Sequence, residues 1–458
     1  MAVYIHARTL TGGYTRLVGV DSFVSGVEDV QAEYFISGLF KYLYLTFSND
    51  STLPLDRWIF NNRGHPLPIF CPASKEKEEA TFSMQKKLCI FEPQPCTDHQ
   101  SINSLNGCRQ AFVRNMTREA FGLYRRYAWG AAIVHPITRQ PSGGFYTSYP
   151  GLSLINALST LWTMGLKKEW AAAVNWVEKE FAYSAINGSI GSMETMTDYL
   201  GGLLSAYALS GKPVLLNRSA AVLETLLPAF HPITGLLVYK IKPSSGQLDV
   251  QWNYLSNVGF QQPELIYLSK LIPNHKAVAR LPGILAKTRQ TMEAAFRPFG
   301  LYMHVVNASS GEPVSSMSTL NNGAIDFYYN MLRSYVQLGR EDAELLEMYA
   351  QAMSATVKAG MFKLMTSGGD GLLYVDSYDV IRRNSSLVMD RTACQLGAML
   401  AIGARELKNV STSAAELHLQ LAVNITETCY QTASRTRTKL LPESFWADGT
   451  VNDNGHLV

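Results

Sequence analysis

Apolar residues recur at three- and four-residue spacing along most of this chain, and the segments that carry this pattern come in pairs. In each pair an apolar helical stretch is followed by a glycine or a short polar turn and then by a second helix. The pairs are residues 154–165 with 167–181, 200–211 with 214–230, and 327–339 with 342–359. The pattern predicts helical hairpins, which can stack into a solenoid or close into a ring, and the pattern alone does not choose between the two.

One long segment breaks the helical pattern. Residues 71–106 are polar, carry several prolines and contain the charged run Lys-Glu-Lys-Glu-Glu. This composition is typical of a linker. We therefore expect a first segment at 1–70, a linker at 71–106 and a main part at 107–458.

The bulk composition is that of a globular protein. The chain has 458 residues, of which 47% are apolar and 17% charged, so it can bury one very large core or two ordinary ones. The net charge of +3 is spread along the sequence without a long lysine or arginine run, which argues against a nucleic-acid partner. No stretch approaches the roughly 18 apolar residues of a membrane span, and the first residues lack the features of a secretory signal.

Two other features point toward the secretory pathway. Asn-X-Ser/Thr sequons, which are glycan acceptors only in that pathway, occur at Asn49, Asn115, Asn187, Asn217, Asn307, Asn384, Asn409 and Asn424. The six cysteines show no Cys-X-X-Cys spacing, which argues against a metal-thiolate site and allows disulfides in an oxidising compartment. We expect a protein of the endoplasmic reticulum or Golgi, or a secreted one, although no signal peptide is visible.

Two long blocks of the sequence resemble a known family. Residues 192–211 read Ser-Met-Glu-Thr-Met-Thr-Asp-Tyr-Leu-Gly-Gly-Leu-Leu-Ser-Ala-Tyr-Ala-Leu-Ser-Gly, and residues 59–68 read Ile-Phe-Asn-Asn-Arg-Gly-His-Pro-Leu-Pro after Phe-Lys-Tyr-Leu-Tyr-Leu at 40–45. They resemble class I α-1,2-mannosidases (glycoside hydrolase family 47). The resemblance implies an all-α fold, an (α/α)7-type barrel of helical hairpins, plugged here by a β-hairpin from residues 55–70.

The order of the blocks is rotated relative to that family. The block at 40–68 resembles the end of the family's domain, whereas the family's beginning resumes near residue 107. In a closed ring the first and last helices are neighbours, so a rotated order is geometrically tolerable. The family's Arg-Pro-Glu segment, which supplies a catalytic glutamate, is missing. The chain is therefore expected to be an incomplete or circularly rearranged barrel, either a true permutant or a gene prediction that joins the tail of one copy to most of the next.

The resemblance implies inverting hydrolysis of terminal α-1,2-mannose on N-glycans, which needs one carboxyl group as acid and another as base. Glu194 matches the general acid; the alternative is a carboxylate that merely favours the first turn of a helix. For the second acid, the family's aspartate and glutamate positions carry Ile325 and Tyr329, and Asp326 lies one residue along, about 100° around the helix axis. Asp326 is a candidate replacement.

Four further residues match family site positions. Asp390, in Met-Asp-Arg, is a catalytic candidate whose structural alternative is pairing with Arg391 or capping a helix. Arg391 replaces the family's histidine and is a candidate for binding the substrate. Glu264 and Glu443 match glutamates of the substrate site, and the alternative for Glu443 is an exposed loop acid.

The resemblance also implies a calcium ion at the barrel floor, bound through a threonine that is Asn62 here. Asn62 can offer a carbonyl oxygen and is the candidate metal ligand, but Arg63 replaces the next glutamate and would repel the ion or occupy its place. Other polar positions change as well: family acids become Asn156 and Ser159, and the arginine after the general acid becomes Asp198. The glycines, aromatics and leucines of the same motifs remain, which is the pattern of a retained fold with an altered site.

The family disulfide matches Cys394 and Cys429 in neighbours and spacing, so the resemblance implies that pairing. We expect a monomeric α-1,2-mannosidase family protein that meets high-mannose N-glycans or glycoproteins and is weak or inactive as an enzyme. Two alternatives remain open at this point. One is a non-catalytic glycan-binding or chaperone-like module, and the other is a truncated or misjoined gene product.

Overall fold

A computed structural model describes residues 7–10, 12–17, 26–70, 105–142, 148–249, 252–258, 262–296, 300–366 and 371–448. Most of the predicted linker, and with it Cys71, Cys89 and Cys96, lies outside the described residues. The longer helical elements are η1 Phe35–Phe40, α2 Lys41–Thr46, α4 Leu105–Tyr127, α5 Leu152–Thr163, α6 Lys167–Lys179, α7 Ser192–Glu194 with η5 Thr195–Leu200 and α8 Gly201–Ser210, α9 Pro213–Leu226, α10 Leu255–Val258, α11 Gln262–Leu271, α12 Leu281–Phe296, α13 Ile325–Gln337, α14 Ala343–Lys358, α15 Leu396–Leu407 and α16 Thr412–Arg435.

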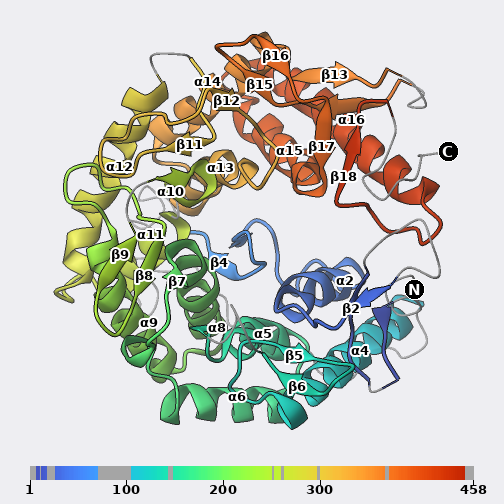
Figure 1. Ribbon diagram of the computed structural model, residues 1–458, viewed down its shortest axis with the longest axis vertical. Helices are drawn as coiled ribbons and strands as arrows, with labels where there is room; N and C mark the ends of the chain where they lie inside the picture. Colours follow the sequence, from blue (N-terminus) through green and yellow to red (C-terminus); the bar gives the residue numbers. More distant parts are fainter. Residues whose placement is uncertain are drawn as a thin grey trace, which may run out of the picture.

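These helices form a ring of hairpins (Figure 1). Helices α5, α8, α11, α13 and α15 line the inside, and α6, α9, α12, α14 and α16 follow each of them on the outside. The prediction of an all-α ring of helical hairpins is confirmed. The predicted pairs coincide with α5–α6, α8–α9 and α13–α14, with bounds that differ by a few residues.

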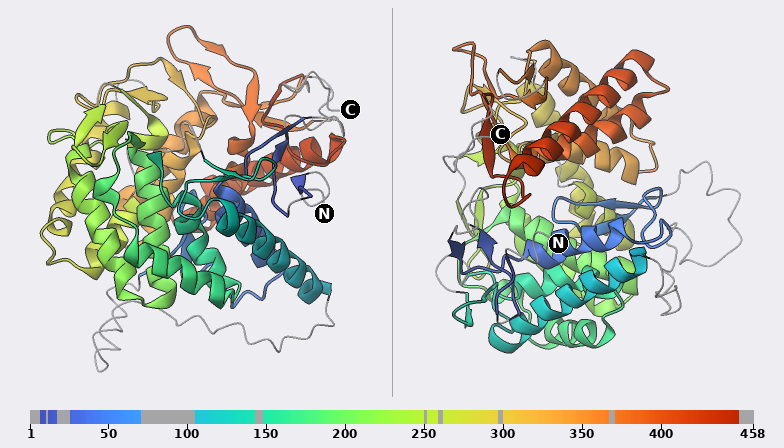
Figure 2. Two further views of the ribbon diagram at one scale, coloured as in Figure 1. Left: turned by 60° about the horizontal axis from the view of Figure 1, so that its bottom comes forward. Right: turned by 90° about the vertical axis from the view of Figure 1, so that its right-hand side faces the viewer.

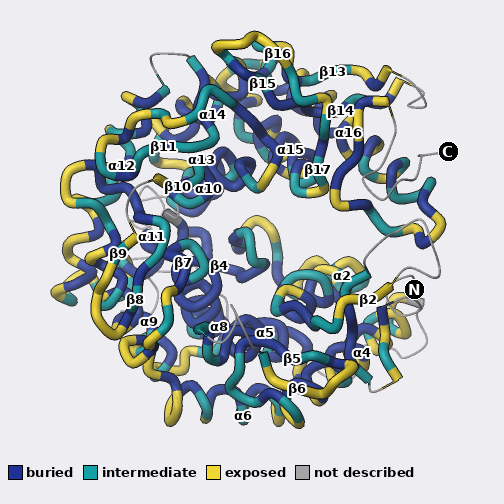
Figure 3. Tube along the Cα trace, in the orientation of Figure 1, coloured by how far each residue is buried: buried dark blue, intermediate teal, exposed yellow. Residues whose placement is uncertain are grey.

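Burial follows this two-layer arrangement. The inner helices α5 and α8 are buried along nearly their whole length, whereas exposed residues gather on the outer helices and the loops (Figure 3). Their sequences explain the difference, because α5 and α8 carry no charged residue and consist of apolar and small polar residues, which suits an enclosed position. The core consists of two clusters, one built by the first part of the chain and one by the last, and Tyr335, Leu338 and Ile402 pack against both.

The strands are short, and Figure 2 shows that many of them gather on one face of the ring. They are β1 Arg16–Leu17, β2 Val27–Glu28, β3 Trp58–Phe60, β4 Pro66–Pro68, β5 Val134–His135, β6 Gln140–Pro141, β7 Ile190–Gly191, β8 Lys240–Lys242, β9 Gln247–Asp249, β10 Asn253–Tyr254, β11 Val305–Val306, β12 Met317–Ser318, β13 Phe362–Leu364, β14 Leu373–Val375, β15 Tyr378–Asp379, β16 Asn384–Ser385, β17 Val388–Asp390 and β18 Ser444–Trp446. All pairings between them are antiparallel.

The hairpin of β3 and β4 lies at the centre of the ring (Figure 1). Trp58 pairs with Pro68 and Phe60 with Pro66, so the turn between the strands projects into the interior. The side chains of β4 are buried, as expected for a hairpin surrounded by helices. This hairpin falls within the predicted segment 55–70.

Two further features bear on the predictions. The disulfide joins Cys394 to Cys429, which ties the start of α15 to α16 and confirms the pairing that the resemblance implied. A cavity of about 1030 Å³ separates α2 from α15; Tyr42 and Leu45 line one side, and Ala398 and Ile402 line the other. Within the described part of the chain, none of the helices has both the length and the apolar character that crossing a bilayer requires.

Candidate active site

The tip of the central hairpin is held by an asparagine. The side-chain oxygen Oδ1 of Asn61 accepts hydrogen bonds from the backbone N–H groups of Arg63 and His65, both at 2.9 Å, and Gly64 completes the turn with a φ of 77°. Asparagine commonly stabilises turns by such side-chain bonds to the backbone, and the positive φ suits glycine. The turn therefore presents the side chains of residues 61–65 to the helices around it.

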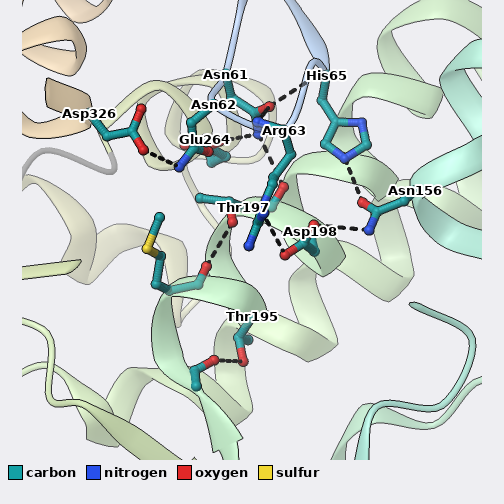
Figure 4. Close-up of polar contacts among 12 residues, drawn as sticks. Asn61, Asn62, Arg63, His65, Asn156, Thr195, Thr197, Asp198, Glu264 and Asp326 are labelled. Carbon is teal, nitrogen blue, oxygen red and sulfur yellow. Dashed lines mark hydrogen bonds and ion pairs between the residues drawn. The ribbon is translucent and has the colours of Figure 1, made fainter. Parts of the chain in front are cut away.

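The tip docks on the inner helices through the two asparagine amides (Figure 4). Asn61 Nδ2 donates to the carbonyl oxygen of Thr197 at 3.1 Å and to Oε1 of Glu264 at 2.7 Å. Asn62 Nδ2 donates to Oδ2 of Asp326 at 3.1 Å. A Cβ on Gly201 would lie 2.6 Å from Asn61 Nδ2, so only glycine lets the tip approach this closely.

Arg63 and Asp198 form an ion pair at the centre of the site. Nε of Arg63 lies 3.3 Å from Oδ2 of Asp198, whose side chain is 1% exposed, whereas that of Arg63 is 26% exposed. The negative charge of Asp198 raises the pKa of Arg63, burial opposes this, and the charges of Glu33, Glu194 and Asp326 add to it. Burial raises the pKa of Asp198 to about 7, and the Arg63 guanidinium opposes that rise.

Asp198 is also held by a chain of neutral side chains. Asn156 Nδ2 donates to Oδ1 of Asp198 at 2.9 Å, which turns the amide oxygen of Asn156 toward Nε2 of His65 at 2.7 Å. Burial lowers the pKa of His65 well below its usual value, so the imidazole is neutral and its proton sits on Nε2. His65 Nδ1 then accepts from Oγ of Ser159 at 3.4 Å.

A buried lysine completes this chain. Lys41 is fully buried, and its Nζ donates to the carbonyl oxygen of Gly64 at 2.5 Å and to Oγ of Ser159 at 2.7 Å. Burial lowers the pKa of Lys41 well below its usual value. The polar groups beneath the hairpin tip thus satisfy one another from Lys41 through Ser159, His65 and Asn156 to Asp198.

Glu194, the predicted general acid, lies at the start of an inner helix as expected. Its carboxylate folds back over Gly191, where a Cβ would lie 1.8 Å from Oε2, and the side chain is partly exposed. The helix continues through the π-helical segment η5, which carries Asp198, and stops at Gly211 with a φ of 67°. The charge of Glu194 adds to the rise in the pKa of both Arg63 and Asp198.

Asp326 and Glu264 are both buried against the hairpin tip. Asp326 is 7% exposed and Glu264 is 1% exposed. Burial raises the pKa of Asp326, opposed by Arg333, Asn62 and Arg63, and burial raises that of Glu264 to about 7, opposed first by the bond from Asn61. Both carboxyl groups therefore favour the protonated form more than ordinary carboxyl groups do.

The other predicted site residues lie in a second place. Asp390, Arg391 and Glu443 line a cavity of about 520 Å³ together with His304. The backbone N–H of Arg391 donates to the carbonyl oxygen of Glu443 at 2.9 Å. The Glu443 side chain is 68% exposed and lies 3.4 Å from the guanidinium of Arg16.

Asp390 caps a helix. Its Oδ1 accepts from the backbone N–H of Thr392 at 2.7 Å and of Ala393 at 3.3 Å, and from the Thr392 hydroxyl, while Oδ2 accepts from the N–H of Asn322. Aspartate is a favoured N-cap because its oxygens satisfy the free N–H groups of the first turn. Asp390 therefore has the helix-capping role that the sequence left open as the alternative to catalysis.

An aromatic row connects the two places. Tyr239 stacks on Trp252 with ring centroids 5.7 Å apart, Trp252 meets Tyr254 edge-on at 5.4 Å, and Tyr254 contacts the His304 ring at 5.2 Å. Burial and the charge of Glu194 raise the pKa of Tyr239. Burial lowers the pKa of His304, and the charge of Asp390 opposes this. Trp252 is 42% exposed. Sequence reasoning missed this row, because its residues come from three segments of the chain, at 239, 252–254 and 304.

Sequence reasoning also missed the support of the floor by Lys41, Asn61 and His65. The sequence held one signal for the pair of Arg63 and Asp198. By the resemblance a glutamate becomes Arg63 and an arginine becomes Asp198, and either change alone would leave two like charges facing each other.

The residues at the hairpin tip do not fit the calcium ion that the resemblance implies. Calcium prefers several hard oxygen ligands. Asn62 offers one buried oxygen, Oδ1, without a hydrogen-bond partner, but its amide is bound to Asp326 and a guanidinium lies in the next residue. Among the residues that the structure describes, no group of three or more histidine, cysteine, aspartate or glutamate side chains is placed to hold a metal ion.

A ring of helical hairpins with a central β-hairpin at its core defines the class of helical-barrel proteins. The structure is similar to an α-1,2-mannosidase from Trichoderma reesei, with a TM-score of 0.61 and 19% identity over 71% of this chain and 68% of that chain. At that identity the likeness concerns the fold, and it agrees with the predicted (α/α)7 barrel.

The chain belongs to Glycosyl hydrolase family 47, which it matches over residues 2–69 and 116–456. It is 30% identical to mannosyl-oligosaccharide alpha-1,2-mannosidase IA of Drosophila melanogaster over 348 residues, 74% of this chain and 50% of that protein. It is 30% identical to mannosyl-oligosaccharide 1,2-alpha-mannosidase IC of Homo sapiens over 345 residues, 73% of this chain and 52% of that protein. The chain thus spans about half the length of the curated relatives it matches.

Proposed function

We propose that this chain binds the terminal mannose units of N-glycan oligosaccharides at the mouth of the ring and cleaves their α-1,2 linkages weakly or not at all. Membership of family 47 supports the glycan as ligand, because the relatives are named as mannosyl-oligosaccharide α-1,2-mannosidases. The state of the candidate carboxyl groups supports the loss of turnover.

The observation that carries the proposal is the pairing of Asp326 with Asn62. Inverting hydrolysis needs an acid and an ionised base on carboxyl groups about 6.5–9.5 Å apart, with room for a water between the base and the sugar. Glu194 remains available as the acid, partly exposed at the helix start. Asp326, the candidate base, is buried, and its Oδ2 accepts a hydrogen bond from Asn62 at 3.1 Å, both of which oppose its action on a water.

Asp390 does not replace it. Its two oxygens accept four hydrogen bonds from Asn322, Thr392 and Ala393, so activating a water would cost the cap of η8 Arg391–Gln395. Because both oxygens of Asp390 already accept hydrogen bonds from the protein, its carboxylate is not free to activate a water.

The aromatic row supplies the binding surface. Sugar-binding pockets combine aromatic faces with a few placed polar groups, because the C–H faces of a pyranose pack on a ring while its hydroxyl groups need partners. Trp252 is 42% exposed and lies between Tyr239 and Tyr254. We assign to it the packing of a mannose face, with Glu194 and Arg63 nearby for hydroxyl groups.

The test measures binding and cleavage on the same sample. Purified protein is titrated with a high-mannose oligosaccharide by calorimetry, and free mannose is measured after long incubation. We expect binding without release, and a loss of affinity of about tenfold or more in Trp252→Ala, since a buried aromatic contact is worth on the order of 1–2 kcal/mol. Tyr430→Ala, an exposed aromatic on the outer helix α16, is the matched control and should bind normally. Release of mannose that disappears in Glu194→Gln would instead establish an active enzyme.

We place this function in the secretory pathway. The sequon asparagines are exposed except for Asn307, which is half-buried, and one relative is the human endoplasmic reticulum mannosyl-oligosaccharide 1,2-alpha-mannosidase, 29% identical over 340 residues. Expression in animal cells followed by endoglycosidase treatment should lower the apparent mass. An unchanged mass would count against this location. We expect a monomer, which sedimentation would check.

A further inference from the structure

We infer that the guanidinium of Arg63 is the permanent cation of the barrel floor, in the place where the family resemblance implies calcium, and that it donates hydrogen bonds to neighbouring hydroxyl groups of the bound sugar. This inference deepens the proposed function and rests on it for the sugar contact. The cation itself is argued from the protein alone.

The position of Arg63 suits both parts of the inference. It lies at the tip of the central hairpin and points toward Asp198 between the inner helices (Figure 4). Its side chain is 26% exposed, so the residue is anchored at Asp198 and still presents part of its surface to a ligand. A guanidinium carries five N–H donors in a planar fork, which leaves donors for a ligand after one edge has met Asp198.

The surroundings of Arg63 favour a cation. Four negative charges raise the pKa of Arg63: that of Asp198 most, and those of Glu33, Glu194 and Asp326 less. Several carboxyl groups around one point repel each other unless a positive charge lies between them. Arginine supplies that charge at every physiological pH, whereas calcium supplies it only when bound.

The two sequence changes at this point compensate each other. The resemblance places a glutamate at position 63 and an arginine at position 198, and this chain has the signs exchanged, Arg63 and Asp198. In the structure the two side chains form an ion pair with Nε and Oδ2 3.3 Å apart. The exchange keeps one positive and one negative group but moves the positive one onto the hairpin tip, beside Asn62.

The pair is also held in place from below. Asp198 accepts from Asn156, and Asn156 in turn meets His65 of the same hairpin at 2.7 Å. A guanidinium positioned by such a network loses little freedom when it binds a ligand, which favours affinity. Three buried oxygens at the tip have no hydrogen-bond partner, Oδ1 of Asn62, Oδ1 of Asp326 and Oδ2 of Asp198, but the last already lies 3.3 Å from the guanidinium, so the arginine stands where an ion would have to bind.

The first experiment concerns the cation and needs no variant. The wild-type protein is titrated with calcium chloride by calorimetry and melted in 1 mM calcium and in EDTA. For a site with a micromolar Kd, 1 mM calcium is about a thousandfold above the Kd, and its binding would raise the Tm by several degrees. We expect no calcium binding and equal melting temperatures. Stoichiometric binding with a calcium-dependent Tm would overturn the inference.

The second experiment concerns the sugar contact. High-mannose oligosaccharide is titrated into wild type, Arg63→Lys and Arg63→Gln, each in EDTA and in calcium. We expect equal wild-type affinity in both media, and a loss of about tenfold or more in both variants that calcium does not restore. Arg63→Lys keeps the charge for folding, so unchanged binding in that variant would refute the role of the planar fork. Binding of Arg63→Gln that calcium restores would show a latent metal site and overturn the inference.

The two failures are distinguishable. If the wild type binds no oligosaccharide in either medium, the proposed function and the sugar contact fail together, while the calcium titration and the melts still decide which cation occupies the floor.

Discussion

Asp198 and Asp390 are both aspartates on the inside of the same ring, and their surroundings differ in kind. Asp198 is 1% exposed, paired with a guanidinium and bonded to an amide side chain. Asp390 faces a cavity of about 520 Å³ and accepts hydrogen bonds mainly from backbone N–H groups at the start of η8. The first depends on side chains that lie far away in the sequence, whereas the second is bonded mostly by its own neighbours, with one hydrogen bond from the distant Asn322.

This difference teaches where the family's site has changed. By the resemblance, Asp390 and Glu443 at the rim match family residues, and Asp390 caps η8 there. By the same resemblance the floor differs more, because Asn62, Arg63, Asn156 and Asp198 all replace other polar residues; in the structure they bind one another or Asp326. At the floor these residues pair with one another without a ligand ion.

The largest expected effect comes from removing the floor cation. Arg63→Met should lower the free energy of unfolding by about 3–5 kcal/mol, because it leaves the buried Asp198 without its counter-ion. The double variant Arg63→Met/Asp198→Asn should recover most of the loss. Chemical denaturation at pH 7.5 would measure both.

The matched control is Arg118→Met. Arg118 pairs with Glu169 at 3.8 Å on the surface, with 53% of its side chain exposed, and such pairs contribute about 1 kcal/mol or less. If Arg63→Met cost no more than Arg118→Met, the contrast between the floor and an ordinary surface ion pair would be wrong.

An intermediate effect is expected from Glu264, whose pKa burial raises to about 7 from an ordinary value near 4.5. Between these two pH values the unfolded chain has lost the proton while the folded chain keeps it, so this group makes stability fall as pH rises. Glu264→Gln keeps an acceptor for Asn61 and should raise the free energy of unfolding by on the order of 2 kcal/mol at pH 8, with little change at pH 4. Denaturation curves across this range would measure it. A wild type and variant that run parallel with pH would contradict the expected burial effect.

The smallest effect concerns the rim. Asp390→Ala should cost about 1 kcal/mol of stability, as the loss of an N-cap does, whereas Asp390→Ser should retain most of it. Thermal or chemical denaturation would compare the two variants. A loss as large as that of Arg63→Met would mean that rim and floor are not different in kind.

The fold was predictable because it depends on repeated local patterns. The pairs at 154–181, 200–230 and 327–359 announce helical hairpins through their apolar spacing, and Gly211 marks a helix end. The family blocks then select a ring, and Cys394 and Cys429 are close enough to be paired within it. Each of these signals lies within a few dozen residues.

The site was less predictable because its contacts are distant. Glu194, Asp326 and Asn62 do gather around the hairpin tip, but the sequence did not reveal that Arg63 joins them through Asp198. The partners of the asparagine amides lie 136 to 264 residues away, and no local pattern records such a pairing. The stacking of Trp252 on Tyr239 escapes for the same reason.

The central hairpin has a consequence for the order in which the protein folds. Its tip supplies the partners for Asp198, Glu264 and Asp326, which lie on three separate inner helices. Until residues 61–65 dock, these three carboxyl groups lack the partners that the tip supplies, and closing so long a loop is slow. We therefore expect the ring to close late in folding and in one cooperative step. A chain that lacks its first seventy residues should remain a partly folded intermediate.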